Sequence, residues 1–292
     1  MASAQLRDTT RRIKSVEATK KITRAMELIA ASRIPKAQAR VQGSKPYTSK
    51  LIEVIENVGA AGTGTSHMLL ERRDPRTYGV LIVASDRGLA GAYASNIIRM
   101  AEIRMRELER GGKDVVIFAV GKKAQSYFRY RGYRIERSFL GVTDTPGYGD
   151  ARAIANTVMG AYADRRIDVL EAFYTRFQSA LTQVPTRLEL LPITPPEAEG
   201  EEVRPSYEFE PSPDEILSRL LPSYVEAVIF NMLLEASASE HSARRRAMKA
   251  ATDNAEELIK TLTVQKNRAR QAEITTAITE IVGGAEALAE SR

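Results

Sequence analysis

The sequence predicts a mixed α plus α/β fold: both termini form one long antiparallel two-helix coiled coil, and a doubly wound α/β domain is inserted between them. Three observations predict it. The end of the chain has helical periodicity, its beginning has it too, and the middle changes to short apolar runs separated by amphipathic segments. The expected parts are the N-terminal coiled-coil helix (1–58), the Rossmann-like insert (77–194), an acidic, proline-rich connector (195–211) and the C-terminal coiled-coil helix (212–292).

The C-terminal part is predicted to be one very long helix. It opens with Ser212-Pro213-Asp214-Glu215, in which Ser212 can cap free amides and Glu215 can complete a capping box. Apolar residues near its end follow the four-three spacing of a left-handed coiled coil: Ile274, Ile278, Ile281, Ala285 and Leu288. A second series keeps this spacing in another phase: Ala251, Ala255, Leu258 and Leu262. The polar belt Gln265–Gln271 separates them, and this phase break predicts a local change of supercoil.

The N-terminal part is predicted to be the partner of that helix, because a rod of roughly 110–120 Å cannot stand alone in water. Its apolar stripe comprises Leu6, Ile13, Val16, Ile22, Met26 and Ile29, and resumes at Leu51, Val54 and Val58. Pro35 and Gly43-Ser44-Lys45-Pro46 interrupt the pattern, so we expect a kink or a local break near each.

The middle of the chain alternates between strand and helix patterns. The expected strands are 78–84, 115–120, 134–140, 168–177 and 186–192, and the expected helices are 92–110, 122–131 and 151–165. Strands separated by helices are typical of a doubly wound α/β layer.

Composition limits the class of protein. The 292 residues, 43% of them hydrophobic, suffice for a real core. We expect no membrane-spanning segment and no secretory signal, because no apolar run approaches the length that a membrane helix needs. Zero cysteines exclude disulfides, thiolate zinc sites and cysteine nucleophiles.

Positive charge is concentrated at the N-terminus. Residues 1–50 hold twelve Lys and Arg against three Asp and Glu, a surplus of +9 in a chain whose net charge is +6. This favours an acidic partner, which could be nucleic acid, an anionic membrane surface or an acidic protein loop. A merely solvated helix face is the alternative.

Motifs for self-sufficient chemistry are missing from the sequence. Ser85–Gly91 follows the first strand and invites a nucleotide interpretation, but it supplies neither G-x-G-x-x-G nor a P-loop. His67 and His241 are expected to be ordinary surface residues, and Asp144 and Asp150 flank a glycine-rich loop without a nucleophile or second metal ligand nearby. We therefore expect no catalytic residue, no cofactor site and no metal site.

Two polar clusters in the C-terminal helix remain to be explained. Arg244-Arg245-Arg246 is interpreted first as a solvated charge run, with an acidic partner as the alternative. Arg268, Arg270 and Gln271 fall where the seam should continue, so they either face water or bond to a specific partner.

Several segments carry a family resemblance, in order, across both ends and the middle of the chain. They are residues 13–16, 19–27 and 30–32, the run Ser85-Asp86-Arg87-Gly88-Leu89-Ala90-Gly91, residues 239–241 and 247–255, and residues 267–272, 274–275 and 280–282. In these the chain resembles the gamma subunits of F-type ATP synthases, of the bacterial type. The resemblance implies an antiparallel coiled coil inside a ring of three alpha and three beta subunits, with the α/β insert near a foot that binds the epsilon subunit and the c-ring.

The function that the resemblance implies is mechanical. Proton flow turns the c-ring, the shaft turns with it, and its unequal contacts give the three beta subunits different nucleotide affinities. It further implies a non-catalytic subunit without cofactor, held peripherally at the cytoplasmic face of the bacterial cell membrane. Matched residue by residue, it implies contacts with the ring at Met26, Arg87, Arg244, Arg270, Gln271 and Thr275. The basic N-terminal residues would face the acidic loop of beta subunits.

The chain departs from the family pattern at Pro35, Arg245-Arg246, Gln265-Lys266 and Ala277. These departures affect the local geometry and some of the rotor contacts that the resemblance implies. Two other classes stay open on the residues alone. One is a basic coiled-coil protein that binds nucleic acid, with affinity that falls steeply with salt. The other is an α/β enzyme with helical arms, which the missing motifs disfavour.

Overall fold

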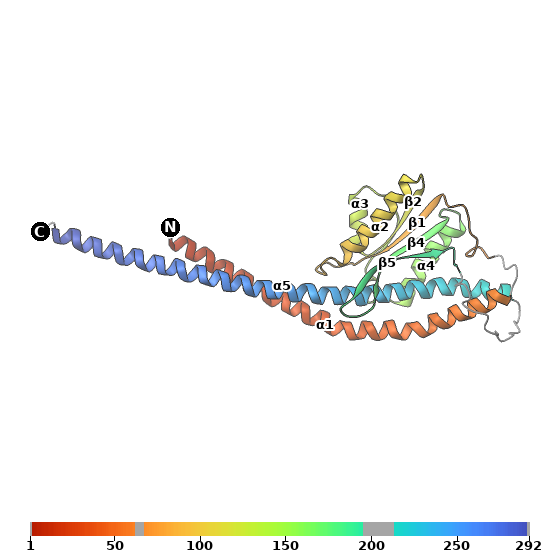
Figure 1. Cartoon of the computed structure of the whole chain (residues 1–292), viewed down its shortest axis with the longest axis horizontal. Coiled ribbons are helices and arrows are strands. Elements are labelled where there is room, and N and C mark those ends of the chain that lie inside the picture. Colours follow the sequence, from red (N-terminus) through yellow and green to blue (C-terminus); the bar gives the residue numbers. More distant parts are fainter. Residues whose placement is uncertain (1, 62–66, 195–212, 291–292) are drawn as a thin grey trace. The chain divides into compact units, whose positions relative to one another are not determined.

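The computed structural model describes residues 2–61, 67–194 and 213–290. It divides into two compact units: unit 1 comprises Met1–Ile29 and Arg245–Arg292, and unit 2 comprises Ala30–Arg244. The two longest helices, α1 (Ala2–Ala61) and α5 (Pro213–Glu290), each supply residues to both units (Figure 1). The expected connector (195–211) and the expected cap at Ser212 lie outside the described residues.

Unit 2 is built on one five-stranded sheet. The strands are β1 (Thr77–Val83), β2 (Asp114–Val120), β3 (Ile135–Phe139), β4 (Val169–Phe177) and β5 (Gln183–Leu191). Their order is β3-β2-β1-β4-β5, parallel from β3 to β4, with β5 antiparallel to β4. The connecting helices are α2 (Tyr93–Arg110), α3 (Lys122–Tyr130) and α4 (Tyr148–Ala163). The doubly wound insert that the sequence predicts is therefore confirmed.

Helices cover both faces of this sheet, which is why its central strands are apolar on both sides. Val80 and Ile82 of β1 pack with α2 and α3 on one face. Leu81 and Val83 point to the other face, where α4 and the first half of α5 complete the core. Leu51 and Ile55 of α1 join this second core. Both terminal helices thus help to bury the sheet.

The apolarity of α5 is concentrated in that core. By length and composition alone, α5 passes a simple test for a membrane span, with a mean hydropathy of 1.3 in an 18-residue window that is 39% buried within the protein. Leu217, Leu221, Val225 and Ile229 of this helix are fully buried against the sheet. The core helices of globular proteins have the same composition, so the test is weak evidence for a membrane segment.

Helix α1 continues without interruption through Pro35 and Pro46. The local breaks expected there are therefore wrong. Both prolines are exposed, so on each the ring occupies the solvent side of the helix, where the missing backbone hydrogen bond leaves a carbonyl that water can reach.

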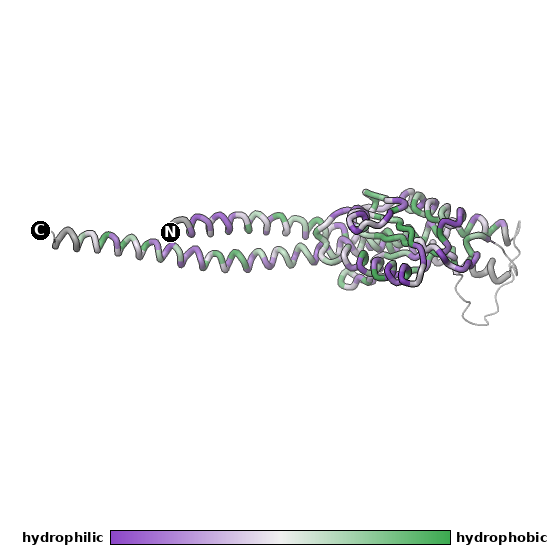
Figure 2. The backbone as a smooth tube through the Cα atoms, turned by 90° about the horizontal axis from the view of Figure 1, so that it is seen from above, coloured by the Kyte–Doolittle hydropathy of each residue, from purple (hydrophilic) through white to green (hydrophobic). Residues whose placement is uncertain are grey.

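In unit 1, α1 and the last part of α5 lie side by side with the two chain ends at the same end of the pair (Figure 2). The hydroxyls of Thr23 and Thr252 lie 2.8 Å apart, and Lys20 forms a 3.1 Å ion pair with Glu256. These contacts set an antiparallel register. The coiled coil is confirmed, with polar groups at its seam.

The inward stripe of α1 differs from the predicted one. Ile22 and Ile29 are 61% and 54% exposed, so their assignment to the seam is wrong. The covered positions of unit 1 keep a four-three spacing: Thr9, Ile13, Val16, Lys20, Thr23 and Glu27. Four of these six are polar, which is why a search for apolar residues selected their neighbours.

The seam of α5 likewise runs on without a phase break. Its covered positions are Met248, Thr252, Ala255, Ile259, Leu262, Lys266, Ala269 and Glu273. Of the predicted series, Leu258 is exposed, and so are Ile274, Ile278 and Ile281 near the end; the side chain of Leu288 lies outside those described. Because the helices are antiparallel, each step back along α1 from Thr23 corresponds to one step forward along α5 from Thr252. Ala2, the first residue of α1, is therefore level with Glu273, and the apolar tail of α5 extends beyond the start of α1.

Candidate functional site

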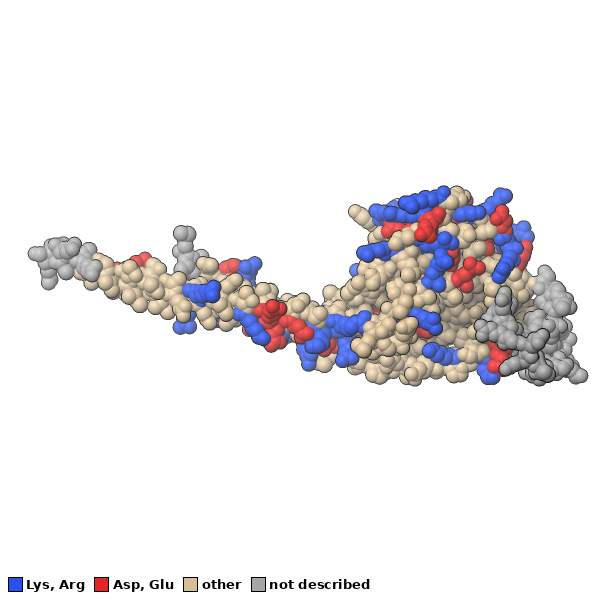
Figure 3. All heavy atoms as spheres, viewed as in Figure 1, with Lys and Arg blue, Asp and Glu red and all other residues tan. Residues whose placement is uncertain are grey.

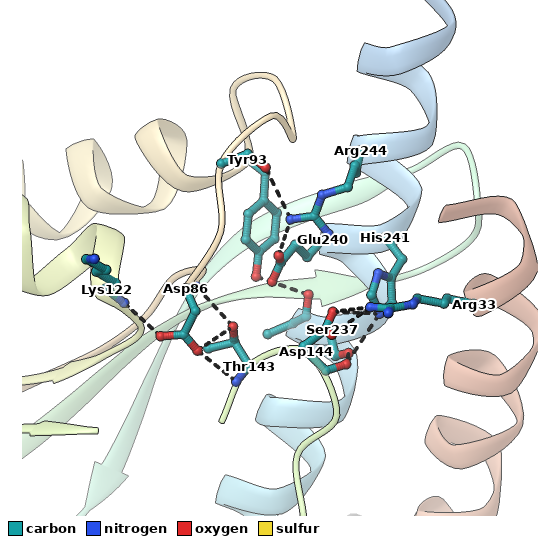
Figure 4. Close-up of polar contacts among 12 residues, drawn as sticks. Arg33, Asp86, Tyr93, Lys122, Thr143, Asp144, Ser237, Glu240, His241 and Arg244 are labelled. Carbon is teal, nitrogen blue, oxygen red and sulfur yellow. Dashed lines mark hydrogen bonds and ion pairs between the residues drawn. The ribbon is translucent and has the colours of Figure 1, made fainter. Parts of the chain in front are cut away.

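One face of α5 carries a cluster of polar side chains that is largely buried in unit 2 (Figure 4). Ser237, Glu240, His241 and Arg244 follow one another at helical spacing, so they project from the same side of α5. They meet Arg33 of α1 and Asp144 of the loop after β3. We call these six residues the α5 joint.

The most deeply buried part of the α5 joint is the ion pair between Arg244 and Glu240. The Arg244 Nη2 atom donates to Glu240 Oε1 and, at 3.3 Å, to the backbone carbonyl of Gly88. Arg244 is only 7% exposed and Glu240 only 1%. Its interpretation as part of a solvated charge run is therefore wrong for Arg244, whereas Arg245 and Arg246 are exposed.

Burial dominates the electrostatics of Glu240. Removal from water raises the pKa of its carboxyl to about 7, because the charge and hydrogen bond of Arg244 offset the desolvation only in part, and the charges of Asp144 and Asp86 raise it further. Beside it, burial raises the pKa of the Tyr93 phenol well above its usual value, and the Tyr93 hydroxyl donates to the carbonyl of Ala236 at 3.0 Å.

Asp144 gathers the other half of the α5 joint. Arg33 Nη1 lies 2.6 Å from both carboxylate oxygens of Asp144, and the Ser237 hydroxyl donates to the Asp144 carbonyl at 3.0 Å. Burial by itself raises the pKa of Asp144, but the hydrogen bond and charge of Arg33 outweigh it, so the pKa lies below its usual value. Burial lowers the pKa of His241, which lies 3.3 Å from the same carbonyl through Nε2.

The loop between β1 and α2 is held by Asp86. Its carboxylate accepts hydrogen bonds from the backbone of Lys122, at 3.0 Å, and from the amide and hydroxyl of Thr143. Gly121 allows the close approach: its φ is +91°, and a Cβ atom there would come within 2.9 Å of the Ser85 carbonyl carbon. The loop that contacts Arg244 is thus held to the first residue of α3 and to the loop that follows β3.

Some polar atoms near the α5 joint have no hydrogen-bond partner within the described residues. They are Glu240 Oε2, His241 Nδ1, Ser242 Oγ and Thr175 Oγ1. In the described parts of the chain, no group of three His, Cys, Asp or Glu side chains is placed to hold a metal ion. The α5 joint fixes α1, α5 and two loops to one another. It does so through the half-exposed Arg33–Asp144 ion pair and through hydrogen bonds from Ser237 and Arg244 to backbone carbonyls, beside the buried pair within α5.

The structure brings two of the sequence-predicted site residues together. They are Arg87 and Arg244. Arg87 is exposed on the β1–α2 loop, and the carbonyl of the next residue, Gly88, accepts a hydrogen bond from Arg244. The other four are in unit 1, where Met26 is half-buried and Arg270, Gln271 and Thr275 are exposed.

Sequence reasoning missed most of the α5 joint. His241 is 3% exposed, so its expected place on the surface is wrong, and Asp144 has Arg33 as a partner that lies far away in the sequence. The one available signal was Glu240 and Arg244 at i and i+4, which pair on a helix. Long-range pairs such as Arg33 with Asp144 have no such signal.

The chain thus combines a two-helix coiled coil with a doubly wound α/β domain. Comparisons with known proteins identify the family that has this combination. A family model described as ATP synthase matches residues 5–288. Curated relatives called ATP synthase gamma chain include those of Acidothermus cellulolyticus, 49% identical over 98% of this chain and 97% of the relative, and Streptomyces coelicolor, 48% identical over 99% and 97%. The chain belongs to the gamma-subunit family of F-type ATP synthases.

Solved structures share the fold. A chain from the rotor of the Euglena gracilis mitochondrial ATP synthase gives a TM-score of 0.67 at 15% identity, covering 93% of this chain and 99% of that one. A chain from the central stalk and c-ring of the Tetrahymena thermophila mitochondrial ATP synthase gives 0.59 at 24% identity, covering 79% and 99%.

Proposed function

We propose that this chain is the central rotor shaft of a proton-translocating F-type ATP synthase. In this role it couples rotation of the c-ring to sequential conformational change, and so to ATP synthesis or hydrolysis, at the beta subunits. The observation that carries the proposal is the similarity to gamma chains over nearly the whole length, 49% identity across 98% of the chain.

The geometry of unit 2 supports this role. A shaft must pass torque between its helices and its globular part without slipping. The α5 joint contributes to this connection through the Arg33–Asp144 ion pair and through hydrogen bonds from Ser237 and Arg244 to backbone carbonyls. Removing Arg244 would also leave the buried carboxyl of Glu240 without its partner, which is costly. The connection therefore resists loosening.

The contacts with the surrounding ring are part of the proposal. Arg87, Arg270, Gln271 and Thr275 are exposed and so can reach a partner, and half-buried Met26 can contribute in part. Arg244 would act differently, because it already bonds within the chain. We assign it to positioning the loop that presents Arg87.

The partners follow from the same role. Three alpha and three beta subunits would surround the coiled coil, and the epsilon subunit and the c-ring would bind at the foot. The chain itself would be non-catalytic, and it would lie at the cytoplasmic face of the bacterial cell membrane through the complex. Exposed basic residues of α1 in unit 1, such as Arg11 and Lys21, suit an acidic partner surface.

Reconstitution tests the proposal. Alpha and beta subunits are mixed with or without the chain, and both ATP hydrolysis and rotation of the chain within the complex are measured. We expect sustained rotation only in the mixture that contains the chain. Equal rates of ATP hydrolysis in both mixtures, together with absence of the chain from the purified complex, would refute the role. A titration with duplex DNA at rising salt tests the nucleic-acid alternative, which predicts tight binding at low salt that is lost steeply.

A further inference from the structure

A cavity of about 610 Å³ opens in unit 2 between the β1–α2 loop, α2 and α3. Its floor begins at Ser85, just after β1, and one wall is the start of α3, just after β2. It therefore lies beyond the carboxyl ends of two parallel strands, the end of a doubly wound sheet at which ligands bind, and beside the switch point, which falls between β1 and β4. Its volume is in the range of pockets for small molecules.

Three cations from three different elements line this cavity. They are Arg87 of the β1–α2 loop, Arg99 of α2 and Lys123 of α3. All three side chains are exposed, and within the described residues none of their charged groups takes part in a hydrogen bond or ion pair. Figure 3 shows Lys and Arg side chains gathered over the part of unit 2 that holds α2 and α3. The cavity is thus positively charged at its mouth.

The acidic residue in the lining does not cancel this charge. Glu102 already accepts from Arg106 and from Tyr127, each at 2.7 Å, and from Arg131 at 3.1 Å. Burial raises the pKa of Glu102, but these three partners together lower it below its usual value. With its carboxylate bonded to two guanidinium groups, Glu102 leaves Arg87, Arg99 and Lys123 available to an anion.

The floor of the cavity provides a buried hydroxyl. Ser85 is 1% exposed and lines the cavity, and its backbone carbonyl accepts from the Lys123 amide at 2.9 Å. A Cβ atom added to Gly88 would lie 3.6 Å from the Lys123 Nζ atom, so this ammonium group lies directly over the loop. A hydroxyl below and an ammonium group above suit a phosphate oxygen.

The rest of the lining is aromatic and apolar. Tyr127 and Tyr130 belong to α3, the same helix as Lys123, and the ring of Tyr130 is largely exposed. Leu89 and Ile98 add apolar surface. Rings of this kind stack on flat heterocycles, so the cations and the rings together suit a ligand with an anionic and a planar end.

We propose that this cavity is a binding site for a nucleoside phosphate, held by Ser85, Arg99 and Lys123 at its phosphates and by Tyr130 at its base. The site is independent of the proposed shaft function. The absent G-x-G-x-x-G motif does not bear on it, because that motif holds a pyrophosphate on backbone amides, whereas side chains provide the contacts here.

The test uses the isolated full chain, since alpha and beta subunits would bind nucleotides themselves. Calorimetric titration compares ADP, pyrophosphate and adenosine. We expect saturable binding of ADP, weaker binding of pyrophosphate and the weakest binding of adenosine, with ADP affinity falling as salt rises. Absence of saturable ADP binding at millimolar concentration would overturn the proposal.

Variants locate the site. We expect Arg99→Glu combined with Lys123→Glu to weaken ADP binding about tenfold or more, and Ser85→Ala to weaken it without any change of charge. Tyr130→Ala should weaken ADP but leave pyrophosphate unchanged. The matched control is Arg129→Glu, which reverses an exposed charge on the same helix outside the cavity. Equal loss in the control, or no loss in the double variant while its circular dichroism stays native, counts against this site.

Discussion

The guanidinium group of Arg244 donates to the backbone carbonyl of Gly88 over 3.3 Å, across 156 residues of sequence. The same group is paired with Glu240 one helical turn earlier on α5. A single side chain thereby connects the long helix to the loop that follows the first strand of the sheet. The consequences of this connection can be measured in the isolated chain.

Removing Arg244 should destabilise unit 2. In Arg244→Ala the carboxyl of Glu240 stays buried without its partner and Gly88 loses a donor, so we expect the free energy of unfolding to fall by about 3 kcal/mol. Urea denaturation followed by circular dichroism measures it. Arg245→Ala, at an exposed neighbour, should change the value by less than about 0.5 kcal/mol. Equal effects at both positions would contradict the pairing.

Glu240 should make stability depend on pH. Its pKa in the folded chain, about 7, lies above the ordinary value of 4.5, so its contribution is fully present below about pH 4.5 and is lost as the pH rises through 7. We therefore expect Glu240→Gln to gain stability relative to the parent chain between pH 5 and pH 8, by about 3 kcal/mol at most.

Comparing Glu240→Gln with the parent chain cancels the effect of the other groups that titrate. Asp144 and His241 have lowered pKa values, so both contribute stability that is lost as the pH falls, and both are present in parent and variant. Glu109→Gln, at an exposed position of α2, is the control and should follow the parent at each pH. Parallel curves for Glu240→Gln and the parent would rule out titration of Glu240 in this range.

Gly121 should tolerate no side chain. Gly121→Ala combines a φ of +91° with a Cβ atom 2.9 Å from the Ser85 backbone, and we expect a loss of roughly 3 kcal/mol or more in unfolding free energy. Gly132→Ala is the matched control, since its φ is +80° and nothing lies within 4 Å of the added Cβ atom. Its expected loss is about 1–2 kcal/mol, the backbone strain alone. Thermal unfolding of the two variants separates contact from strain.

Arg270 and Gln271 should matter only in the assembled complex. Both are exposed, so Arg270→Ala and Gln271→Ala are expected to unfold like the parent chain within about 0.5 kcal/mol. In reconstituted enzyme we expect them to lower ATP hydrolysis or its coupling to proton pumping. Lys260→Ala, exposed on the same helix, is the control. Unchanged hydrolysis and pumping in both variants would leave the ring contacts without support.

The sequence predicted the elements well where the pattern was local. Runs such as residues 115–120 are apolar because both faces of β2 are covered, and the structure confirms them as strands. The stripe predicted for α1 was wrong because its seam is mostly polar: Thr23 and Glu27 are buried while Ile22 is exposed. A periodicity search weighs hydrophobicity, so it cannot find a seam that is covered but polar.

The α5 joint was beyond sequence reasoning for another reason. Whether Arg244 is solvated or buried depends on a loop more than 150 residues away, and no spacing records that distance. His241 was misplaced in the same way. The boundaries assigned from composition, such as 1–58 and 77–194, stay predictions, because α1 and α5 take part in both compact units.

The contact between the buried hydroxyls of Thr23 and Thr252 specifies the axial alignment of the paired helices. Sliding one helix past the other by seven residues, about 10 Å, would keep the four-three spacing intact. It would also set Thr23 against Ile259 and Thr252 against Ala30, leaving both hydroxyls facing hydrocarbon. Each hydroxyl would lose its contact with the other and keep only the bond to a carbonyl of its own helix, so this alignment alone joins the two. The axial reach of the rod is thus specified by two small side chains in the middle of an otherwise repetitive seam.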